Sequence, residues 1–83
     1  METKKIQQID LFESRDQYIS ALLFSMGLKL EDTRRDGNVV FFIFENKQKC
    51  EEIQKKFYQN QLKINPKNFI DGLITIKHLI FGN

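Results

Sequence analysis

The sequence has no tryptophan and only one cysteine, one proline and one histidine among its 83 residues. A single cysteine can form neither an intrachain disulfide nor a cysteine-based zinc site, and it is typical of a reducing compartment. No apolar run approaches the roughly 20 residues of a membrane span. The opening Met1–Lys5 also lacks the apolar core of a signal peptide. We therefore expect a cytoplasmic protein without a membrane partner.

The length predicts a single domain over residues 1–83, with residues 1–5 disordered. The hydrophobic share of 41%, which includes eight phenylalanines, is too high for a disordered chain and supplies a core. The net charge is +2, and residues 46–83 carry seven lysines against three acidic residues. A chain this close to neutral can bind nucleic acid only through a local basic patch.

Three strands are predicted. The first spans residues 6–12, where apolar and polar residues alternate as in a half-buried strand. The second begins at Leu28, and the third is the β-prone run 39–44. Between them, Asp36-Gly37 is a strong signal for a two-residue hairpin turn. Since the third strand is apolar on both faces, we expect it at the centre of an antiparallel sheet in the order 1-3-2, with a helix as the crossover from the first strand.

That crossover helix is predicted over residues 15–26. Ser14 and Gln17 have the spacing of a capping box at its start. Gly27 stands where a left-handed residue ends a helix. The residues that recur at helical spacing, and are expected in the core, are Tyr18, Ile19, Leu22 and Met26.

Two more helices follow, over about residues 47–60 and from Pro66 to about Phe81. Asn46 can cap the first of them. Its core side is predicted to carry Cys50, Ile53 and Phe57. Residues 62–64 form either a short fourth strand or a connector. The predicted fold class is therefore α+β, a three-stranded antiparallel sheet packed with three helices.

The hairpin turn sets the pairing of the second and third strands, with Leu30 opposite Ile43 and Asp32 opposite Phe41. We expect the first helix to cover the face formed by Leu28, Leu30, Val39, Phe41 and Ile43. The other face carries Val40, Phe42 and Phe44. If that face is open, its rings can stack nucleic-acid bases; if the C-terminal helices cover it, it is the other half of the core. The free energy gained by burying large apolar side chains favours the covered alternative.

Residues for catalysis are scarce. His78 is predicted to share one face of the last helix with Asp71 and Thr75, but a triad requires convergence in a cleft, so this pattern is more typical of a solvated face. Cys50 is expected to pack as a small hydrophobic residue. Asp32–Gly37 lacks the downstream ligands of a calcium loop, and the glycines are isolated. We expect no enzymatic activity, no metal and no other cofactor.

Basic residues offer one candidate nucleic-acid surface. Arg34 and Arg35 are expected near the hairpin tip, where they can reach a phosphate backbone. The lysines that can extend this patch are Lys47, Lys49, Lys63 and Lys67. The alternative is an ordinary solvated surface, and a true patch would bind DNA or RNA in a strongly salt-dependent way.

The last helix is apolar over more than half of its circumference. One stripe, expected to face the core, consists of Phe69, Leu73, Ile76 and Ile80. Ile70, Ile74 and Phe81 lie on another side of this helix, and Phe24 lies on the polar side of the first helix. Either the last helix is buried on two sides within the monomer, or one side meets a second copy. We expect a homodimer with its interface at Phe24, Ile70, Ile74 and Phe81.

Several short segments resemble a family of small uncharacterised bacterial and phage proteins. They are Phe12–Leu23 with Met26–Leu30, the hairpin end Phe42-Ile43-Phe44-Glu45, the acidic helix Cys50–Tyr58 and the segment Ile76–Ile80. The resemblance implies a phage or mobile-element context and no particular activity. The βαββα order also resembles the layout of the first five elements of an RNA-recognition motif, although the sequence motifs of that family are missing.

Two functions of different classes remain open at this point. The first is a small non-enzymatic accessory protein of a phage or mobile element that acts by binding an unidentified protein. The second is a nucleic-acid-binding regulator that uses Arg34, Arg35 and the C-terminal lysines.

Overall fold

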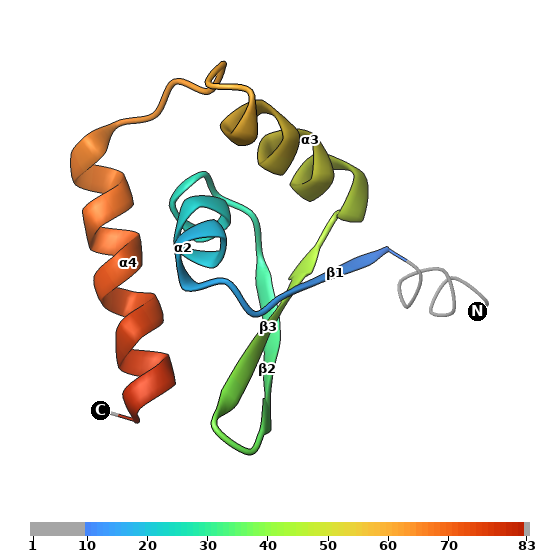
Figure 1. Cartoon of the computed structure of the whole chain (residues 1–83), viewed down its shortest axis with the longest axis vertical. Helices are drawn as coiled ribbons and strands as arrows, with labels where there is room; N and C mark the ends of the chain where they lie inside the picture. Colours follow the sequence, from blue (N-terminus) through green and yellow to red (C-terminus); the bar gives the residue numbers. More distant parts are fainter. Residues whose placement is uncertain (1–9, 83) are drawn as a thin grey trace.

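The computed structural model describes residues 10–82, which form three strands and three helices (Figure 1). In chain order these are β1 (Leu11–Ser14), α2 (Gln17–Ser25), β2 (Leu30–Asp36), β3 (Val39–Glu45), α3 (Lys47–Tyr58) and α4 (Pro66–Phe81). The strands pair antiparallel in the order β1-β3-β2. The predicted α+β class and strand order are confirmed.

The first strand is shifted along the chain from its predicted place at residues 6–12. β1 runs from Leu11 to Ser14 and pairs with the last four residues of β3. Residues 6–9 of the predicted strand, and the expected disorder of residues 1–5, lie outside the described residues.

The capping box predicted at Ser14 and Gln17 is wrong, because Asp16 caps α2 instead. One carboxylate oxygen of Asp16 accepts hydrogen bonds from the N–H groups of Tyr18 (2.8 Å) and Ile19 (3.1 Å). Asp is as good an N-cap as Ser, and Ser14 is already part of β1. The Ser14 hydroxyl accepts a bond from the Asp16 N–H (3.2 Å), so it shapes the strand-to-helix connection rather than the helix end.

The predicted C-terminal end of α2 is confirmed. Gly27 has a φ of +90°, which a residue with a side chain rarely adopts. The Gly27 N–H donates to the Phe24 carbonyl and the Leu28 N–H donates to the Leu23 carbonyl, each at 3.1 Å. This pair of bonds is the Schellman motif, and it turns the chain out of α2 towards β2.

The hairpin register differs from the predicted one. Asp36 pairs with Val39, so the turn residues are Gly37 and Asn38 rather than Asp36 and Gly37. Gly37 has a φ of +64° at the first turn position, as in a type II′ turn. A β-bulge between Leu30 and Asp32 then moves the pairing back by one residue.

This register decides which sheet face the helices cover, and the prediction that the first helix covers the Phe41 face is wrong. The bulge places Leu30 opposite Phe44, and β1 places Phe12 there from the other side. The Phe44 face therefore collects apolar side chains from all three strands. Across from Phe41, β2 presents charged side chains on this face, because Arg34 lies opposite Phe41 with Asp32 and Asp36 on either side of it. Helices pack where apolar area can be buried, which is the Phe44 face.

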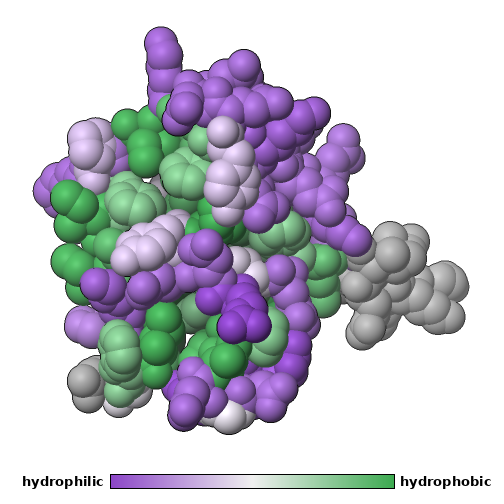
Figure 2. Space-filling model, in the orientation of Figure 1, coloured by the Kyte–Doolittle hydropathy of each residue, from purple (hydrophilic) through white to green (hydrophobic). Residues whose placement is uncertain are grey.

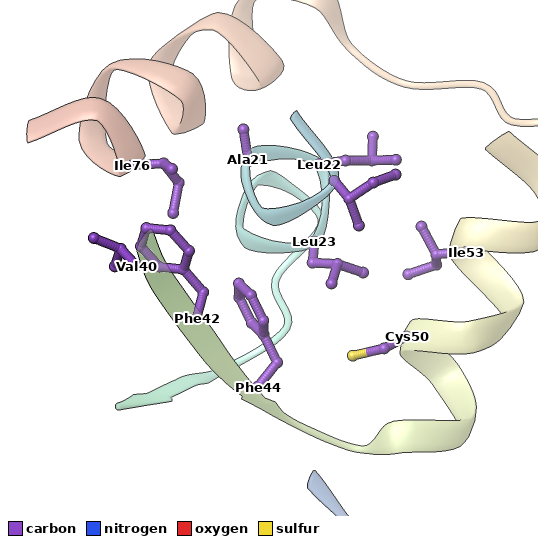
Figure 3. Close-up of a cluster of buried hydrophobic side chains, with 10 residues drawn as sticks. Ala21, Leu22, Leu23, Val40, Phe42, Phe44, Cys50, Ile53 and Ile76 are labelled. Carbon is purple, nitrogen blue, oxygen red and sulfur yellow. The ribbon is translucent and has the colours of Figure 1, made fainter. Parts of the chain in front are cut away.

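The core lies between that face and the three helices (Figure 3). Val40, Phe42 and Phe44 of β3 point towards α2, with α3 and α4 on either side of it (Figure 1). The helices contribute Ile19, Ala21, Leu22, Leu23, Cys50, Ile53 and Ile76. The expectation that this face is covered is thus confirmed, although α2 shares the covering with the C-terminal helices.

The later helices begin as predicted. The side chain of Asn46 accepts from the Lys49 N–H (3.2 Å) at the start of α3. The side chain of Asn65 accepts from the N–H groups of Lys67 (2.9 Å) and Asn68 (3.1 Å) at the start of α4. Residues 62–64 form no strand and connect the two helices.

Three residues expected in the core lie at the surface. Tyr18 is 52% exposed, Met26 39% and Phe57 42%. Each lies at a helix end: Tyr18 in the first turn of α2, Met26 at its C-cap and Phe57 in the last turn of α3. The periodic pattern is correct there, but the neighbouring elements do not extend far enough to cover these side chains.

Helices α2 and α4 approach each other closely at Gly72. A Cβ atom on Gly72 would lie 2.9 Å from the Ala21 carbonyl oxygen and 3.2 Å from the Ser25 Cβ atom. The absence of a side chain therefore sets the distance between the two helices. The predicted core stripe of α4 is confirmed, since Ile76 is buried and Phe69, Leu73 and Ile80 pack against the core.

Candidate functional site

Arg34 lies on the open face of the sheet, opposite Phe41. Its guanidinium carbon is 4.3 Å from the centre of the Phe41 ring, and its Nη2 atom donates to the Glu13 carboxylate at 2.9 Å. The side chain therefore crosses β3 and reaches β1. A cation–π contact and an ion pair together hold it in place.

Arg35 projects to the other side of β2, towards the helices. Its Nη2 atom donates to the carbonyl oxygen of Ile80, near the end of α4, at 2.7 Å. The two arginines are neighbours in sequence, but strand alternation places them on opposite faces. They do not form a joint basic patch at the hairpin tip, and each is engaged within the chain.

The four candidate lysines fall into two groups. Lys47 and Lys49 lie in the first turn of α3, whereas Lys63 and Lys67 lie beyond its other end. Since α3 has 12 residues and is about 18 Å long, most of its length separates the two groups. The Nζ atom of Lys67 also pairs with the Asp71 carboxylate at 3.0 Å.

The most exposed apolar surface on a helix is the outer face of α4, which we define as Ile70, Ile74 and Phe81. These side chains are 54%, 49% and 70% exposed. The opposite side of α4 is closed, because Gly72 and Ile76 are buried against α2 and the sheet. Hydrophobic residues gather along the side of the molecule that α4 occupies in the space-filling view (Figure 2). Three of the four predicted interface residues thus lie on one surface.

The fourth, Phe24, does not belong to this surface. It is half-buried and packs against the core, although the helical pattern places it on the polar side of the first helix. The reason is that α4 lies along α2 and covers that side of it. Phe24 lines a shallow hollow of about 200 Å³ together with Ser25, Asn68, Asp71, Gly72 and Thr75.

A larger pocket of about 440 Å³ lies at the C-terminal end of α4. It is lined by the start of α2 (Arg15–Tyr18), the hairpin (Asn38–Val40) and Ile80 with Phe81. Phe81 belongs to both the pocket and the outer face of α4, so the two surfaces are continuous. Tyr18 lines this pocket, although the sequence pattern predicted it in the core. Its position in the first turn of α2 is the only sequence signal that could have indicated an exposed side chain.

Among the charged side chains on the open face of the sheet, acidic ones predominate. Glu13 of β1, Asp32 and Asp36 of β2, and Glu45 of β3 share this face with Arg34. A hydrogen bond with Glu31, and then partial desolvation, raise the pKa of the Glu45 carboxyl, while Lys29 opposes this. Lys29 lies 3.8 Å from Glu45 and 3.7 Å from Glu31. This face has one aromatic ring on β3, and Arg34 already covers it.

Among the residues with catalytic potential, Cys50 lies on α3, whereas Asp71, Thr75 and His78 lie on α4. Cys50 is buried, and burial raises the pKa of its thiol to about 11, with smaller contributions from Asp10 and Glu51. The Asp71 carboxylate pairs with Lys67, and the Thr75 hydroxyl donates to the Asp71 backbone carbonyl at 3.2 Å. Within residues 10–82, no three His, Cys, Asp or Glu side chains are grouped closely enough to hold a metal ion.

Comparison with known proteins gives one match. A family model described as a domain of unknown function (DUF5659) matches residues 4–82. No curated protein and no solved structure matches the chain. In the part of the chain that the structure describes, every helix is too short or too polar to cross a membrane.

Proposed function

The chain belongs to the DUF5659 family, a domain of unknown function, and from its geometry we propose that it is a non-enzymatic module that binds another protein through the outer face of α4. The observation that carries the proposal is the exposure of Ile70, Ile74 and Phe81 on a helix whose other side is fully packed. Exposed apolar patches of this kind are typical of protein-binding surfaces. The neighbouring pocket adds an anchor point, since Phe81 forms part of its wall.

The charges on the molecule support a protein partner over a nucleic acid. Arg34 and Lys67 each pair with a carboxylate within the chain, which weakens their attraction for phosphate, and the Arg35 guanidinium already donates to the Ile80 carbonyl. The layout shared with the RNA-recognition motif would place bases on the open face of the sheet. Acidic side chains surround Phe41 on that face, and they would repel a phosphate backbone.

We extend the proposal to the biological setting. The short segments that resemble small bacterial and phage proteins support an accessory role in a phage or mobile element. The lone free cysteine, Cys50, supports a cytoplasmic setting, because it has no disulfide partner within the chain.

The proposal is tested by comparing the proteins that three tagged baits retain. These are the wild type, Ile74→Lys, and Tyr58→Lys as a control, because Tyr58 is a similarly exposed apolar residue on a different helix. A partner of α4 is retained by the wild type and by Tyr58→Lys and is lost with Ile74→Lys. For the purified partner, we expect Ile74→Lys to raise Kd at least about tenfold. Equal retention by all three baits would contradict the proposal.

The nucleic-acid alternative is tested by electrophoretic shift with single- and double-stranded probes at about 50 and about 200 mM salt. We expect no shift at micromolar protein. Salt-sensitive binding that is lost in the Arg34→Ala/Arg35→Ala variant would replace the present proposal with the nucleic-acid one.

A further inference from the structure

The outer edge of β2 is open. β2 is an edge strand of the sheet, and all of its seven residues except the half-buried Leu30 are exposed. Within residues 10–82, no strand pairs with its outer side. The N–H of Thr33 bonds to the carboxylate of Asp32 at 2.8 Å. Along an antiparallel strand, the backbone N–H and C=O groups of successive residues point to alternate sides. The N–H and C=O groups of Thr33 and Arg35 therefore both point towards this open edge.

From this edge we infer that two copies of the chain pair antiparallel along β2, about a two-fold axis at Thr33. The dimer then has one continuous sheet in the order β1-β3-β2-β2-β3-β1. This contact lies apart from the outer face of α4, which stays available to a different protein. The inference therefore goes beyond the proposed function and does not depend on it.

The charge pattern of β2 makes the strand complementary to itself. Along β2, the acidic residues Glu31 and Asp32 precede Thr33, and Arg34 and Arg35 follow it. With the axis at Thr33, Asp32 of each copy lies opposite Arg34 of the other. Asp32 and Arg34 both lie on the open face of the sheet, so their side chains meet on the same side. Opposite charges at directly facing positions stabilise an antiparallel pair.

The two neighbouring registers that keep the same face outward are unfavourable. Moving the axis to Asp32 places Asp32 against its own copy, and moving it to Arg34 places two guanidinium groups together. Like charges directly opposite each other destabilise a pair. Charged edges often prevent strand addition, but here acidic and basic residues are separated along the strand. Of these three registers, only the one with its axis at Thr33 places opposite charges face to face.

The contacts already made by Arg34 are compatible with this pairing. Its guanidinium uses Nη2 to reach Glu13, and the side chain remains 48% exposed. A guanidinium has five N–H donors, so Asp32 of the second copy can bind without displacing Glu13. The Thr33 N–H would exchange its bond with Asp32 for the Thr33 carbonyl of the second copy. This exchange also frees the Asp32 carboxylate for Arg34.

Paired charge variants test the inference. In Asp32→Arg each copy presents two arginines to two arginines, and in Arg34→Asp it presents two aspartates to two aspartates. Mixing these variants one to one restores both opposite-charge pairs. Sedimentation equilibrium at roughly 10–200 µM suits the micromolar affinity of a small interface. We expect the wild type to approach twice 9.9 kDa, each variant alone to stay near 9.9 kDa, and the mixture to dimerise.

Two further variants identify the surface. Thr33→Pro removes the N–H that points towards the open edge. We expect circular dichroism to show that this variant is folded and sedimentation equilibrium to show that it is a monomer. Ile74→Lys changes only the outer face of α4, and we expect it to dimerise like the wild type. A wild type that stays monomeric throughout this range would overturn the inference. So would a dimer that Ile74→Lys abolishes while both charge variants leave it intact.

Discussion

Arg34 and Phe41 face each other on the outer surface of the sheet, with the guanidinium carbon 4.3 Å from the ring centre. Phe42, the next residue, points the opposite way and is fully buried among the helices. The two adjacent rings therefore have different environments. One is half-exposed beneath a charged group, and the other fills the centre of the core (Figure 3).

This difference predicts unequal losses of stability. Phe42→Ala should lower the free energy of unfolding by about 3–5 kcal/mol, as expected for a fully buried phenylalanine. Phe41→Ala should lower it by about 1–2 kcal/mol, since only part of that ring leaves water. Urea unfolding of both variants measures these values. The register predicted from the sequence buries Phe41, so a larger loss for Phe41→Ala would favour that register over the observed one.

The start of α2 gives a second prediction. Asp16→Ala removes an oxygen that accepts from two backbone N–H groups, and we expect it to cost about 1 kcal/mol. Gln17→Ala is the matched control, because Gln17 would matter only if Ser14 and Gln17 formed a capping box. We expect Gln17→Ala to leave the urea midpoint nearly unchanged. Equal losses for the two variants would indicate that Asp16 does not act as the cap.

Much of this fold could be predicted because its signals are local. Gly27, Asn46 and Asn65 each mark a helix end through the backbone conformation or the hydrogen bonds that their residue type provides. The β-prone run of β3, which is apolar on both faces, likewise identified a central strand. None of these conclusions required knowledge of distant contacts.

The parts that could not be predicted depend on choices between elements. A single extra residue in β2, the bulge at Glu31, moves Leu30 to the face of Phe44 and so decides where the helices pack. The helical pattern places Phe24 on the polar side of the first helix, yet it is half-buried because α4 lies beside it. On the outer face of α4 the prediction succeeded, because an excess of apolar residues over what one buried stripe requires is visible in the sequence.

The contact between α2 and α4 gives a third prediction. In an exposed helix, Gly→Ala should stabilise by about 1 kcal/mol. At Gly72 the added Cβ would lie 2.9 Å from the Ala21 carbonyl oxygen, a backbone atom that can move only with its helix. We therefore expect Gly72→Ala to destabilise by roughly 1–3 kcal/mol, the usual cost of overpacking. Asn68→Ala, at an exposed position of the same helix, is the control and should be neutral or stabilising.

The thiol of Cys50 gives the last prediction, which concerns pH. Burial first, and the nearby Asp10 and Glu51 second, raise the pKa of this thiol from 9.0 to about 11. As the pH rises above about 9, the thiol loses its proton in the unfolded chain but keeps it in the folded protein. The folded state then binds more protons than the unfolded state. This group's contribution to stability is therefore complete below pH 9 and is lost between about pH 9 and about pH 11.

Lysines and tyrosines also titrate in this range, so the effect of Cys50 has to be measured as a difference. Urea unfolding of the wild type and of Cys50→Ala at about pH 8 and about pH 10 isolates it. We expect the wild type to lose more stability than Cys50→Ala between these two values, although Cys50→Ala starts lower because it leaves a cavity. A thiol held in the neutral form should also react with a thiol reagent only after unfolding. Rapid labelling of the native protein at pH 8, or equal pH dependence of the two proteins, would contradict a buried and protonated Cys50.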